Sequence, residues 1–238
     1  MDEKNVLRSE KEPRRDKNCE NLTFAAKEAF KRLRTNIIMS FPQGKKCCTI
    51  GVTSAQPSEG KSTVSLNLAY SLAELGDKVL LIDADMRRSS IHKKLGIELT
   101  PGLSNLMEDT NSISTVVKKY QSSTDDTWFD IITGGSTPLN PSELLNSKRM
   151  EQLLKALKSV YDYIVIDLPP VGAVIDAVAV SKQTDGMLVV IRENNCPRRV
   201  LTDCVDQLKF ANINILGFVM NGALEGAGKR YQYSSYYK

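Results

Sequence analysis

Short apolar runs alternate with amphipathic stretches along most of this 238-residue chain. The runs are rich in Val, Ile and Leu, as in buried strands, and the stretches between them repeat apolar residues every three or four positions, as in helices that pack on a sheet. This alternation predicts an α/β fold with a mostly parallel central sheet, because crossover helices cover both faces of such a sheet. The predicted strands are 47–53, 78–83, 128–133, 163–167, 186–192 and 215–220, and the predicted helices are 22–40, 62–75, 112–120, 142–159, 173–182 and 198–210.

The two ends of the chain lack this alternation. Residues 1–20 carry six basic and six acidic side chains but only two large aliphatic ones, so they cannot bury enough apolar surface to fold. Residues 222–238 contain three glycines followed by four closely spaced tyrosines, which favours a flexible segment. The sequence therefore predicts a flexible N-terminal arm at 1–20, one folded domain at 21–221 and a flexible, tyrosine-rich tail at 222–238.

Composition narrows the class of protein. The chain has 41% hydrophobic and 25% charged residues, close to the average of soluble globular proteins, which excludes a fibrous or mainly disordered protein. Its net charge of +4 comes without long blocks of Lys or Arg, so we expect no nucleic-acid partner. No apolar run is long enough to span a bilayer and no signal peptide is visible, so we expect a cytoplasmic protein. The five cysteines show no Cys-x-x-Cys spacing, which predicts reduced thiols and no zinc site.

The segment Ala55-Gln-Pro-Ser-Glu-Gly-Lys-Ser-Thr63 lies between a predicted strand and a predicted helix. In a P-loop the backbone N–H groups surround nucleotide phosphates, a lysine neutralises them, and a Ser or Thr hydroxyl binds Mg²⁺. Ala55 stands here in place of the usual first glycine. A Gly-Lys-Ser turn at a helix start would give part of the pattern, but the flanking strand and helix favour a P-loop. The predicted nucleotide-binding residues are Gln56, Pro57, Ser58, Glu59, Gly60, Lys61, Ser62 and Thr63.

Acidic residues close two of the predicted strands. Asp83 and Asp85 follow one apolar run, and Asp167 ends another. Because the carboxyl ends of parallel strands meet at one crevice, we expect all three to approach the phosphates and the magnesium ion held by the P-loop. The alternatives are a helix cap for Asp167 and a solvated turn for Asp83 and Asp85. The joint pattern predicts a magnesium site made by Ser62, Asp83 and Asp167.

Four motifs together resemble the bacterial tyrosine kinases of capsule and exopolysaccharide synthesis. They are Ser54–Ser62, Leu81–Arg87, the segment from Gly134 through Asn140–Leu145, and Ile166–Pro170. In that family the first is the Walker A motif, the second an additional Walker A′ motif and the last the Walker B motif. The resemblance covers about residues 22–238 and implies a P-loop NTPase fold, a three-layer sandwich whose mostly parallel central sheet is flanked by helices. Ser58 and Leu168 depart from the family's usual Gly and Thr, and neither change removes a phosphate or metal ligand.

The resemblance implies an ATP- and Mg²⁺-dependent protein-tyrosine kinase. Lys61 would hold the phosphates, and Asp83, or as a second candidate Asp85, would accept the proton of the tyrosine hydroxyl. Arg87 would neutralise charge near the pocket or pair with Asp85. Asn221 resembles an adenine-reading asparagine of related ATPases. The implied phosphate acceptors are tyrosines in the tail of a neighbouring subunit, namely Tyr231, Tyr233, Tyr236 and Tyr237. The alternatives for this tyrosine cluster are a partner-binding tail or an aromatic edge strand.

The resemblance also implies partners. Glu28, Lys31 and Arg34 match a Glu-x-x-Arg-x-x-Arg helix pattern that the family uses for ring-like self-association, with Lys31 in place of the first arginine. A solvated helix face is the alternative interpretation. A membrane-bound activator would recruit the kinase to the inner face of the plasma membrane, and a cognate phosphotyrosine phosphatase would oppose it. Other tyrosine-containing proteins would be substrates, and the activity would regulate polysaccharide synthesis and export.

A switch ATPase is the main alternative function. Septum-positioning and plasmid-partition ATPases share the P-loop but hydrolyse ATP to control dimerisation, without transfer to tyrosine. They carry a lysine five residues before the P-loop lysine, and this chain has Gln56 there. That difference favours the kinase. A nonenzymatic nucleotide-binding module is a second alternative, which the intact Lys61, Ser62, Asp83 and Asp167 disfavour.

Overall fold

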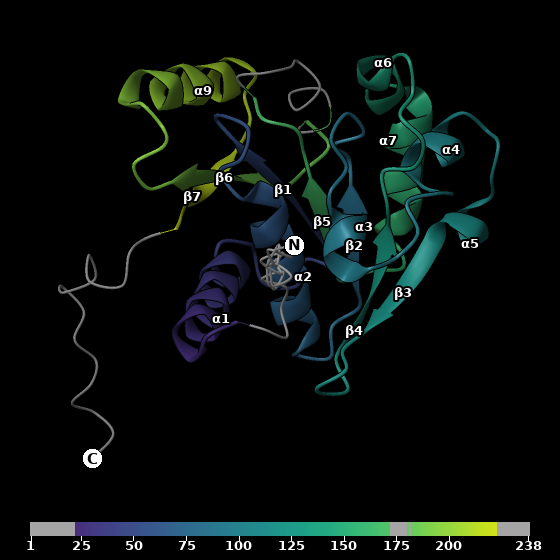
Figure 1. The fold of residues 1–238 in the computed structure, drawn as a ribbon, viewed down its shortest axis with the longest axis horizontal. Helices are drawn as coiled ribbons and strands as arrows, with labels where there is room; N and C mark the ends of the chain where they lie inside the picture. Colours follow the sequence, from purple (N-terminus) through teal and green to yellow (C-terminus); the bar gives the residue numbers. More distant parts are fainter. Residues whose placement is uncertain (1–21, 172–179, 181, 223–238) are drawn as a thin grey trace, which may run out of the picture.

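A seven-stranded sheet forms the centre of the domain (Figure 1). The computed structural model describes residues 22–171, 180 and 182–222. The strand order is β3-β4-β2-β5-β1-β6-β7, and every neighbouring pair is parallel except the antiparallel pair of β3 and β4 at one edge. The strands are β1 (Cys48–Ser54), β2 (Val79–Asp83), β3 (Val117–Gln121), β4 (Trp128–Ile132), β5 (Tyr163–Asp167), β6 (Gly186–Arg192) and β7 (Ile215–Asn221).

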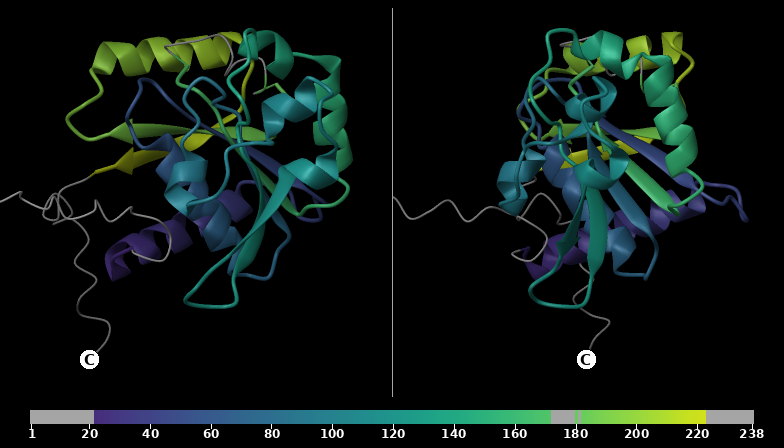
Figure 2. Two further views of the ribbon diagram at one scale, coloured as in Figure 1. Left: turned by 45° about the vertical axis from the view of Figure 1, so that its right-hand side comes forward. Right: turned by 90° about the vertical axis from the view of Figure 1, so that its right-hand side faces the viewer.

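Helices cover both faces of the sheet, so the predicted three-layer sandwich is confirmed (Figure 2). One buried cluster joins the sheet to α1, α2 and α3, and a second cluster joins the opposite face to α4, α5, α6, α7 and α9. None of the helices within the described part of the chain has the length and apolar character needed to cross a bilayer. Their bounds are α1 (Phe24–Met39), α2 (Lys61–Ala73), α3 (Ile91–Leu95), α4 (Leu103–Met107), α5 (Ile113–Val116), α6 (Pro141–Leu145), α7 (Lys148–Leu157) and α9 (Arg198–Phe210).

Helix α2 is buried on nearly all sides. Twelve of its 13 residues are buried, because the sheet covers one side and α1 packs on another. Arg34 of α1 donates hydrogen bonds to the carbonyl oxygen of Ser71 and, at 3.2 Å, to Oε2 of Glu74 at the end of α2. A helix enclosed in this way provides a rigid support for the loop at its N-terminus.

The prediction of a helix at 112–120 is wrong. Only the short α5 forms there, and the chain then continues as the edge strand β3. Contacts with β4 explain the difference: the rings of Tyr120 and Phe129 lie 5.1 Å apart, and Lys119 Nζ lies 3.8 Å from the ring centroid of Trp128. Cross-strand aromatic pairs of this kind stabilise a strand, and the local spacing of apolar residues does not reveal them.

Two other differences concern helices, and one predicted helix is not tested. The predicted helix 142–159 is two helices, α6 and α7, because Ser147 caps α7 by accepting a hydrogen bond from the backbone N–H of Met150 at 3.2 Å. The five-residue helices α3 and α4 were not predicted, since so short a segment carries no visible period. The predicted helix 173–182 lies almost wholly outside the described residues, as do the predicted arm at 1–20 and all of the tail except Gly222.

Candidate active site

The P-loop, residues 55–63, connects the end of β1 to the start of α2. Gly60 precedes α2 with φ of +92°, a left-handed conformation that glycine adopts without strain. A Cβ atom at this position would lie 1.9 Å from Nδ2 of Asn221, so the space also requires glycine. Inside the loop, the buried carboxylate of Glu59 accepts a hydrogen bond from the backbone N–H of Gln56 at 2.9 Å. These contacts give the loop a defined shape.

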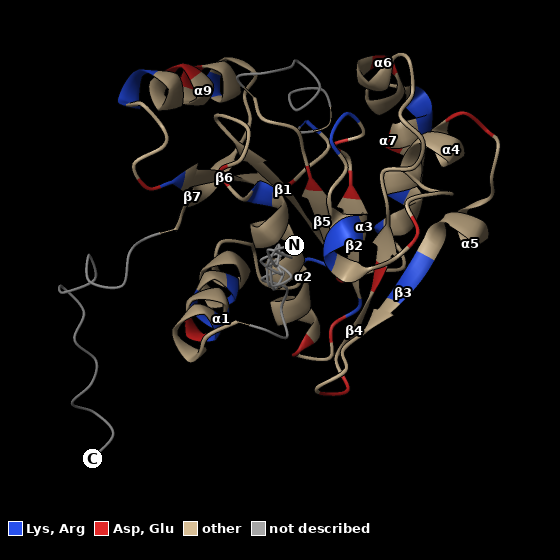
Figure 3. Cartoon of the chain, viewed as in Figure 1, with Lys and Arg blue, Asp and Glu red and all other residues tan. Residues whose placement is uncertain are grey.

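Two buried carboxylates lie side by side beyond the loop. Asp83 of β2 and Asp167 of β5 are register partners, and Figure 3 shows these acidic strand ends close to basic segments of the chain. Oδ1 of Asp167 accepts a hydrogen bond from the Ser65 hydroxyl at 3.0 Å. Oδ2 of Asp83 accepts hydrogen bonds from the Ser89 hydroxyl at 2.7 Å and from two backbone N–H groups at the start of α3. Oδ1 of Asp83 is buried without a hydrogen-bond partner.

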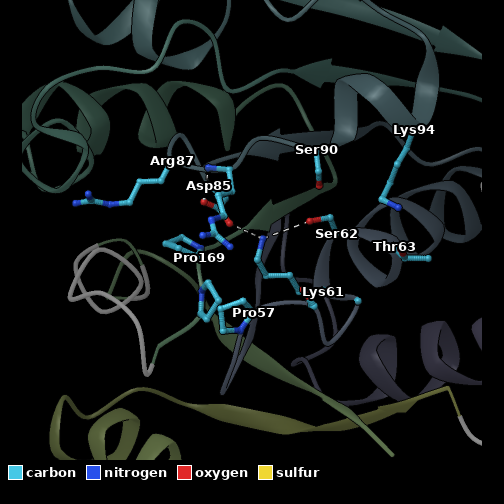
Figure 4. Close-up of a pocket in the computed structure, with 13 residues that line it drawn as sticks. Pro57, Lys61, Ser62, Thr63, Asp85, Arg87, Ser90, Lys94 and Pro169 are labelled. Atoms are coloured by element: carbon cyan, nitrogen blue, oxygen red, sulfur yellow. Dashed lines mark hydrogen bonds and ion pairs between the residues drawn. The ribbon is translucent and has the colours of Figure 1, made fainter. Parts of the chain in front are cut away.

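Lys61 lies beside the carboxylate of Asp85 (Figure 4) and close to that of Asp167. Its Nζ is 2.8 Å from Oδ2 of Asp85, 3.4 Å from Oδ2 of Asp167 and 3.3 Å from the hydroxyl of Ser62. Burial acts to lower the pKa of Lys61, but the charges of Asp167 and Asp85 outweigh it and the pKa is raised. The lysine therefore stays positively charged although it is buried.

Burial also changes the ionisation of the carboxylates. It raises the pKa of Asp83 to about 7, and the negative charge of Asp167 adds to the effect. Burial raises the pKa of Asp167 as well, although Lys61 opposes the rise. Three carboxylates thus share one ammonium group, and the local excess of negative charge favours an additional cation.

The chemistry of these side chains fits Mg²⁺. The described residues contain no group of three or more His, Cys, Asp or Glu side chains arranged to hold a metal ion. Mg²⁺ commonly takes only one or two carboxylates and completes its shell with waters and phosphate oxygens. Ser62, Asp83 and Asp167 supply such a set, and the unpartnered Oδ1 of Asp83 is an oxygen that a metal-bound water could satisfy.

A cavity of about 450 Å³ opens at this end of the sheet. P-loop residues form one wall, and residues from the β2–α3 connection form the opposite wall (Figure 4). Asp85 lines the cavity itself, whereas Asp83 lies behind Ser90, whose backbone N–H bonds to it. Arg87 donates a hydrogen bond to the hydroxyl of Ser142 at 3.3 Å, which links the cavity to α6. The lining residues are Pro57, Ser58, Gly60, Lys61, Ser62, Thr63, Asp85, Arg87, Arg88, Ser90, Lys94, Pro169 and Pro170.

Some of these lining residues were not predicted as site residues. Arg88, Ser90 and Lys94 reach the cavity because the chain turns after Asp85 and enters α3 beside the P-loop. The available sequence signal was their position just after the Walker A′ motif. Arg87, Arg88 and Lys94 thus place three cationic side chains around the opening, an arrangement suited to a polyanionic ligand.

The remaining predicted site residues are Asn221, three residues of α1 and the four tail tyrosines. Asn221, at the end of β7, donates a hydrogen bond from Nδ2 to the carbonyl oxygen of Glu59 at 2.9 Å. Glu28 and Lys31 form an ion pair of 2.9 Å on the exposed surface of α1. Arg34 turns instead toward α2, as described above, so the three members of the predicted self-association pattern do not form one exposed row. The four tail tyrosines lie outside the described residues.

Comparison with known proteins places this geometry in a family. Residues 48–214 match the family described as an AAA domain. The tyrosine-protein kinase YwqD of Bacillus subtilis is 34% identical over 206 residues, which span 87% of this chain and 85% of that protein. The tyrosine-protein kinase CpsD of Streptococcus agalactiae is 32% identical over 212 residues, which span 89% of this chain and 90% of that protein. By contrast, the chain spans 29% of the tyrosine-protein kinase Etk of Escherichia coli.

Solved structures agree with these relatives. The kinase domain of Escherichia coli Etk superposes with a TM-score of 0.78 at 34% identity, covering 87% of this chain and 80% of that one. The septum site-determining protein MinD of Pyrococcus horikoshii is more distant, with a TM-score of 0.59 at 25% identity over 73% of this chain and 70% of that one. The closer likeness to the kinases, together with Gln56 in place of the switch-ATPase lysine, favours the kinase over the switch ATPase. The chain belongs to the bacterial tyrosine-protein kinases, within the AAA-domain family.

Proposed function

We propose that this chain transfers the γ-phosphoryl group of MgATP to tyrosine hydroxyls, including those in the tail of a neighbouring copy, and thereby regulates capsule or exopolysaccharide synthesis and export. The observation that carries the proposal is the cluster of Lys61, Asp83, Asp85 and Asp167, of which Lys61 and Asp85 line the cavity. They come from α2, β2, the connection after β2, and β5, so only the folded sheet brings them together.

MgATP supplies the phosphoryl group and a metal ion that neutralises charge on the phosphate oxygens. The P-loop backbone would bind the phosphates, and the Lys61 ammonium, already at the cavity wall, would turn toward them. Ser62, Asp83 and Asp167 would hold the ion, partly through water. Arg88 and Lys94 would stabilise the remaining negative charge from the opposite wall.

The tyrosine proton needs an acceptor, because an unperturbed tyrosine has a pKa of about 10. Both oxygens of Asp85 are engaged: Oδ2 pairs with Lys61 at 2.8 Å, and Oδ1 accepts from the backbone N–H of Arg88 at 3.1 Å. Asp83 keeps Oδ1 without a partner. We therefore assign Asp83 as the acceptor and Asp85 as the residue that holds Lys61. Since Asp83 lies behind Ser90, the proton would pass through one water molecule.

The proposed partners follow from the reaction. Self-association would present Tyr231, Tyr233, Tyr236 and Tyr237 of one copy to the cavity of another. A membrane-bound activator would recruit this cytoplasmic chain to the inner face of the plasma membrane, other tyrosine-containing proteins would be further substrates, and a cognate phosphotyrosine phosphatase would reverse the modification. We propose no nucleic-acid partner, because the net charge is only +4 and there are no long blocks of Lys or Arg.

Transfer between subunits tests this function directly. The full chain, labelled with heavy isotopes and carrying Lys61→Ala, is mixed with unlabelled wild-type chain and MgATP, and phosphotyrosine is located by mass spectrometry. We expect phosphate on the heavy tail only when wild-type chain is present. Lys155→Ala, an exposed lysine on α7, is the matched control and should behave as wild type. ATP hydrolysis without phosphotyrosine in either tail would refute the kinase and favour the switch ATPase.

A further inference from the structure

Asn221 contacts the P-loop from the side opposite the carboxylates. Its Nδ2 donates to the carbonyl oxygen of Glu59 at 2.9 Å, and its amide fills the space that a Cβ atom at Gly60 would need. Asn221 is the last residue of β7 and the register partner of Arg192 on β6. The end of the sheet edge therefore touches the backbone of the loop just before α2.

Two further contacts join the same edge to the same loop. Arg192 Nη1 lies 3.5 Å from the carbonyl oxygen of Ser58, and the side chain of Gln56 donates to the carbonyl oxygen of Asn195 at 3.3 Å. Ser58 has φ of +66° in the left-handed region, which is unfavourable for a serine unless its surroundings hold it. Contacts from β6, the turn after it and β7 thus hold the loop at Ser58 and on both sides of it.

The bond from Asn221 sets the direction of one phosphate-binding group. The Glu59–Gly60 peptide is planar and trans, so its C=O and N–H bonds point in opposite directions. Because the carbonyl oxygen of Glu59 points to Asn221, the N–H of Gly60 points away from β7, and Gly60 lines the cavity. Without this hydrogen bond, the peptide can rotate and the N–H loses its fixed direction.

We propose that Asn221 is a positioning residue that orients the P-loop for any polyphosphate ligand, whatever base the ligand carries. An adenine-reading asparagine would contribute only to ligands that contain adenine. A positioning residue would contribute equally to ATP, GTP and a polyphosphate with no base. The inference rests on the proposed function only in that the loop receives a polyphosphate, and it does not require transfer to tyrosine.

Binding of a base-free ligand separates the two roles. Titration calorimetry on the full chain measures the affinities for magnesium tripolyphosphate, MgATP and MgGTP. The wild type, Asn221→Ala and Asn221→Asp are compared. One intramolecular hydrogen bond contributes up to about 1.5 kcal/mol, or about tenfold in affinity. We expect Asn221→Ala to weaken all three ligands by a common factor of about 3 to 10, and Asn221→Asp, which places a carboxylate against the carbonyl oxygen, to weaken them further.

Asn214→Ala is the matched control. Asn214 also donates from its side-chain amide to a backbone carbonyl, that of Asp185 at 3.0 Å, but at the opposite end of β7. It should leave all three affinities unchanged, and thermal melting should show Asn214→Ala and Asn221→Ala folded at the titration temperature. Should Asn221→Ala be unfolded there, Asn221→Asp alone provides the comparison.

The outcomes separate this inference from the proposed function. If Asn221→Ala loses affinity for MgATP but binds tripolyphosphate as the wild type does, the positioning role is overturned and adenine recognition explains the loss. A wild-type chain that binds no tripolyphosphate would also overturn it. A chain that binds all three ligands and loses them together in Asn221→Ala, yet labels no tyrosine, would refute the kinase proposal and support the positioning role.

Discussion

At the scale of single residues, the site depends on groups held in environments they would not meet in water. Gly60 adopts a left-handed backbone against Asn221, Lys61 is charged although buried, and Asp83 keeps an unpartnered oxygen. Each of these states costs free energy that the surrounding fold must offset. Binding of a metal–polyphosphate ligand would satisfy several of them at once.

Replacement of Gly60 by alanine should weaken MgATP binding by at least about 30-fold. The left-handed conformation and the contact with Asn221 together cost about 2 kcal/mol or more, and the loop must distort to relieve them. Gly76→Ala is the control, because Gly76 has a similar φ of +85° but open space around its Cβ position. It should lower stability by about 1 kcal/mol without changing MgATP affinity. Equal MgATP affinity of Gly60→Ala and wild type in calorimetry would contradict the steric argument.

The buried cysteines predict a pH dependence. Burial raises the pKa of Cys47 and of Cys204 from 9.0 to about 11. Because the folded state favours the neutral thiols, their contribution to stability is present below about pH 9 and is lost as the pH rises through about 11. At pH 8 the thiolate fraction should be about 100-fold lower than for a thiol with a pKa of 9.0.

Iodoacetamide labelling followed by peptide mass spectrometry checks this expectation. In native protein at pH 8, Cys47 and Cys204 should react at least about 100-fold more slowly than in urea-denatured protein, and the native rate should rise about tenfold per pH unit up to pH 10. Cys196, which is partly exposed, should react first among the cysteines at described positions. Similar native and denatured rates for Cys47 would show that burial does not protect it.

At the scale of elements, the pairing of α1 with α2 supports the P-loop. Leu33 and Ile37 pack in the same apolar cluster as α2, and Arg34 reaches the C-terminal end of α2. Arg34, one residue of the pattern that resembles a self-association motif, therefore has a structural role within one subunit. Loss of self-association in an Arg34 variant would not by itself identify an interface residue.

Arg34→Ala should lower the free energy of unfolding by about 1 to 2 kcal/mol. The substitution removes charged hydrogen bonds to Ser71 and Glu74 from a largely buried guanidinium group. Lys31→Ala removes only an exposed ion pair with Glu28 and should change stability by less than about 0.5 kcal/mol. Urea unfolding followed by circular dichroism, at concentrations where both variants are monomeric, compares them. Equal effects of the two substitutions would contradict the anchoring role of Arg34.

At the scale of the whole molecule, charge connects the proposed reaction to assembly. The chain carries a net charge of +4, and each tyrosine phosphate adds about −1.5 to −2. Phosphorylation of the four tail tyrosines would change the net charge to about −2 to −4 and concentrate the added charge within seven consecutive residues. Neighbouring tails in an assembly would then repel each other.

Tail phosphorylation should therefore weaken self-association, and the effect should decrease at high salt because exposed charges are screened. Sedimentation velocity of the phosphorylated and phosphatase-treated full chain, at 50 mM and 500 mM salt, measures both effects. A variant with all four tail tyrosines changed to phenylalanine is the control and should sediment as the unmodified chain. An unchanged profile after complete phosphorylation would refute the link between tail charge and assembly.

The local sequence was sufficient for much of this structure. Six of the seven strands were predicted to within one residue at each end, because a buried parallel strand is a continuous apolar run bounded by polar turns. The P-loop followed from a motif whose residues are adjacent in the chain. The edge strand β3 could not be predicted, since it is stabilised by Phe129 and Trp128 of another strand.

The sequence by itself determined which side chains are available for chemistry, namely a P-loop lysine, three strand-end aspartates and a cluster of tail tyrosines. Tertiary structure decided how they are used. Only the strand order places Asp83 opposite Asp167, only the folded site raises the pKa of Asp83 through burial and the charge of Asp167, and only the position of β7 brings Asn221 to the carbonyl of Glu59. The physical reason is that motifs depend on neighbours along the chain, whereas distances, burial and charge coupling depend on neighbours in space.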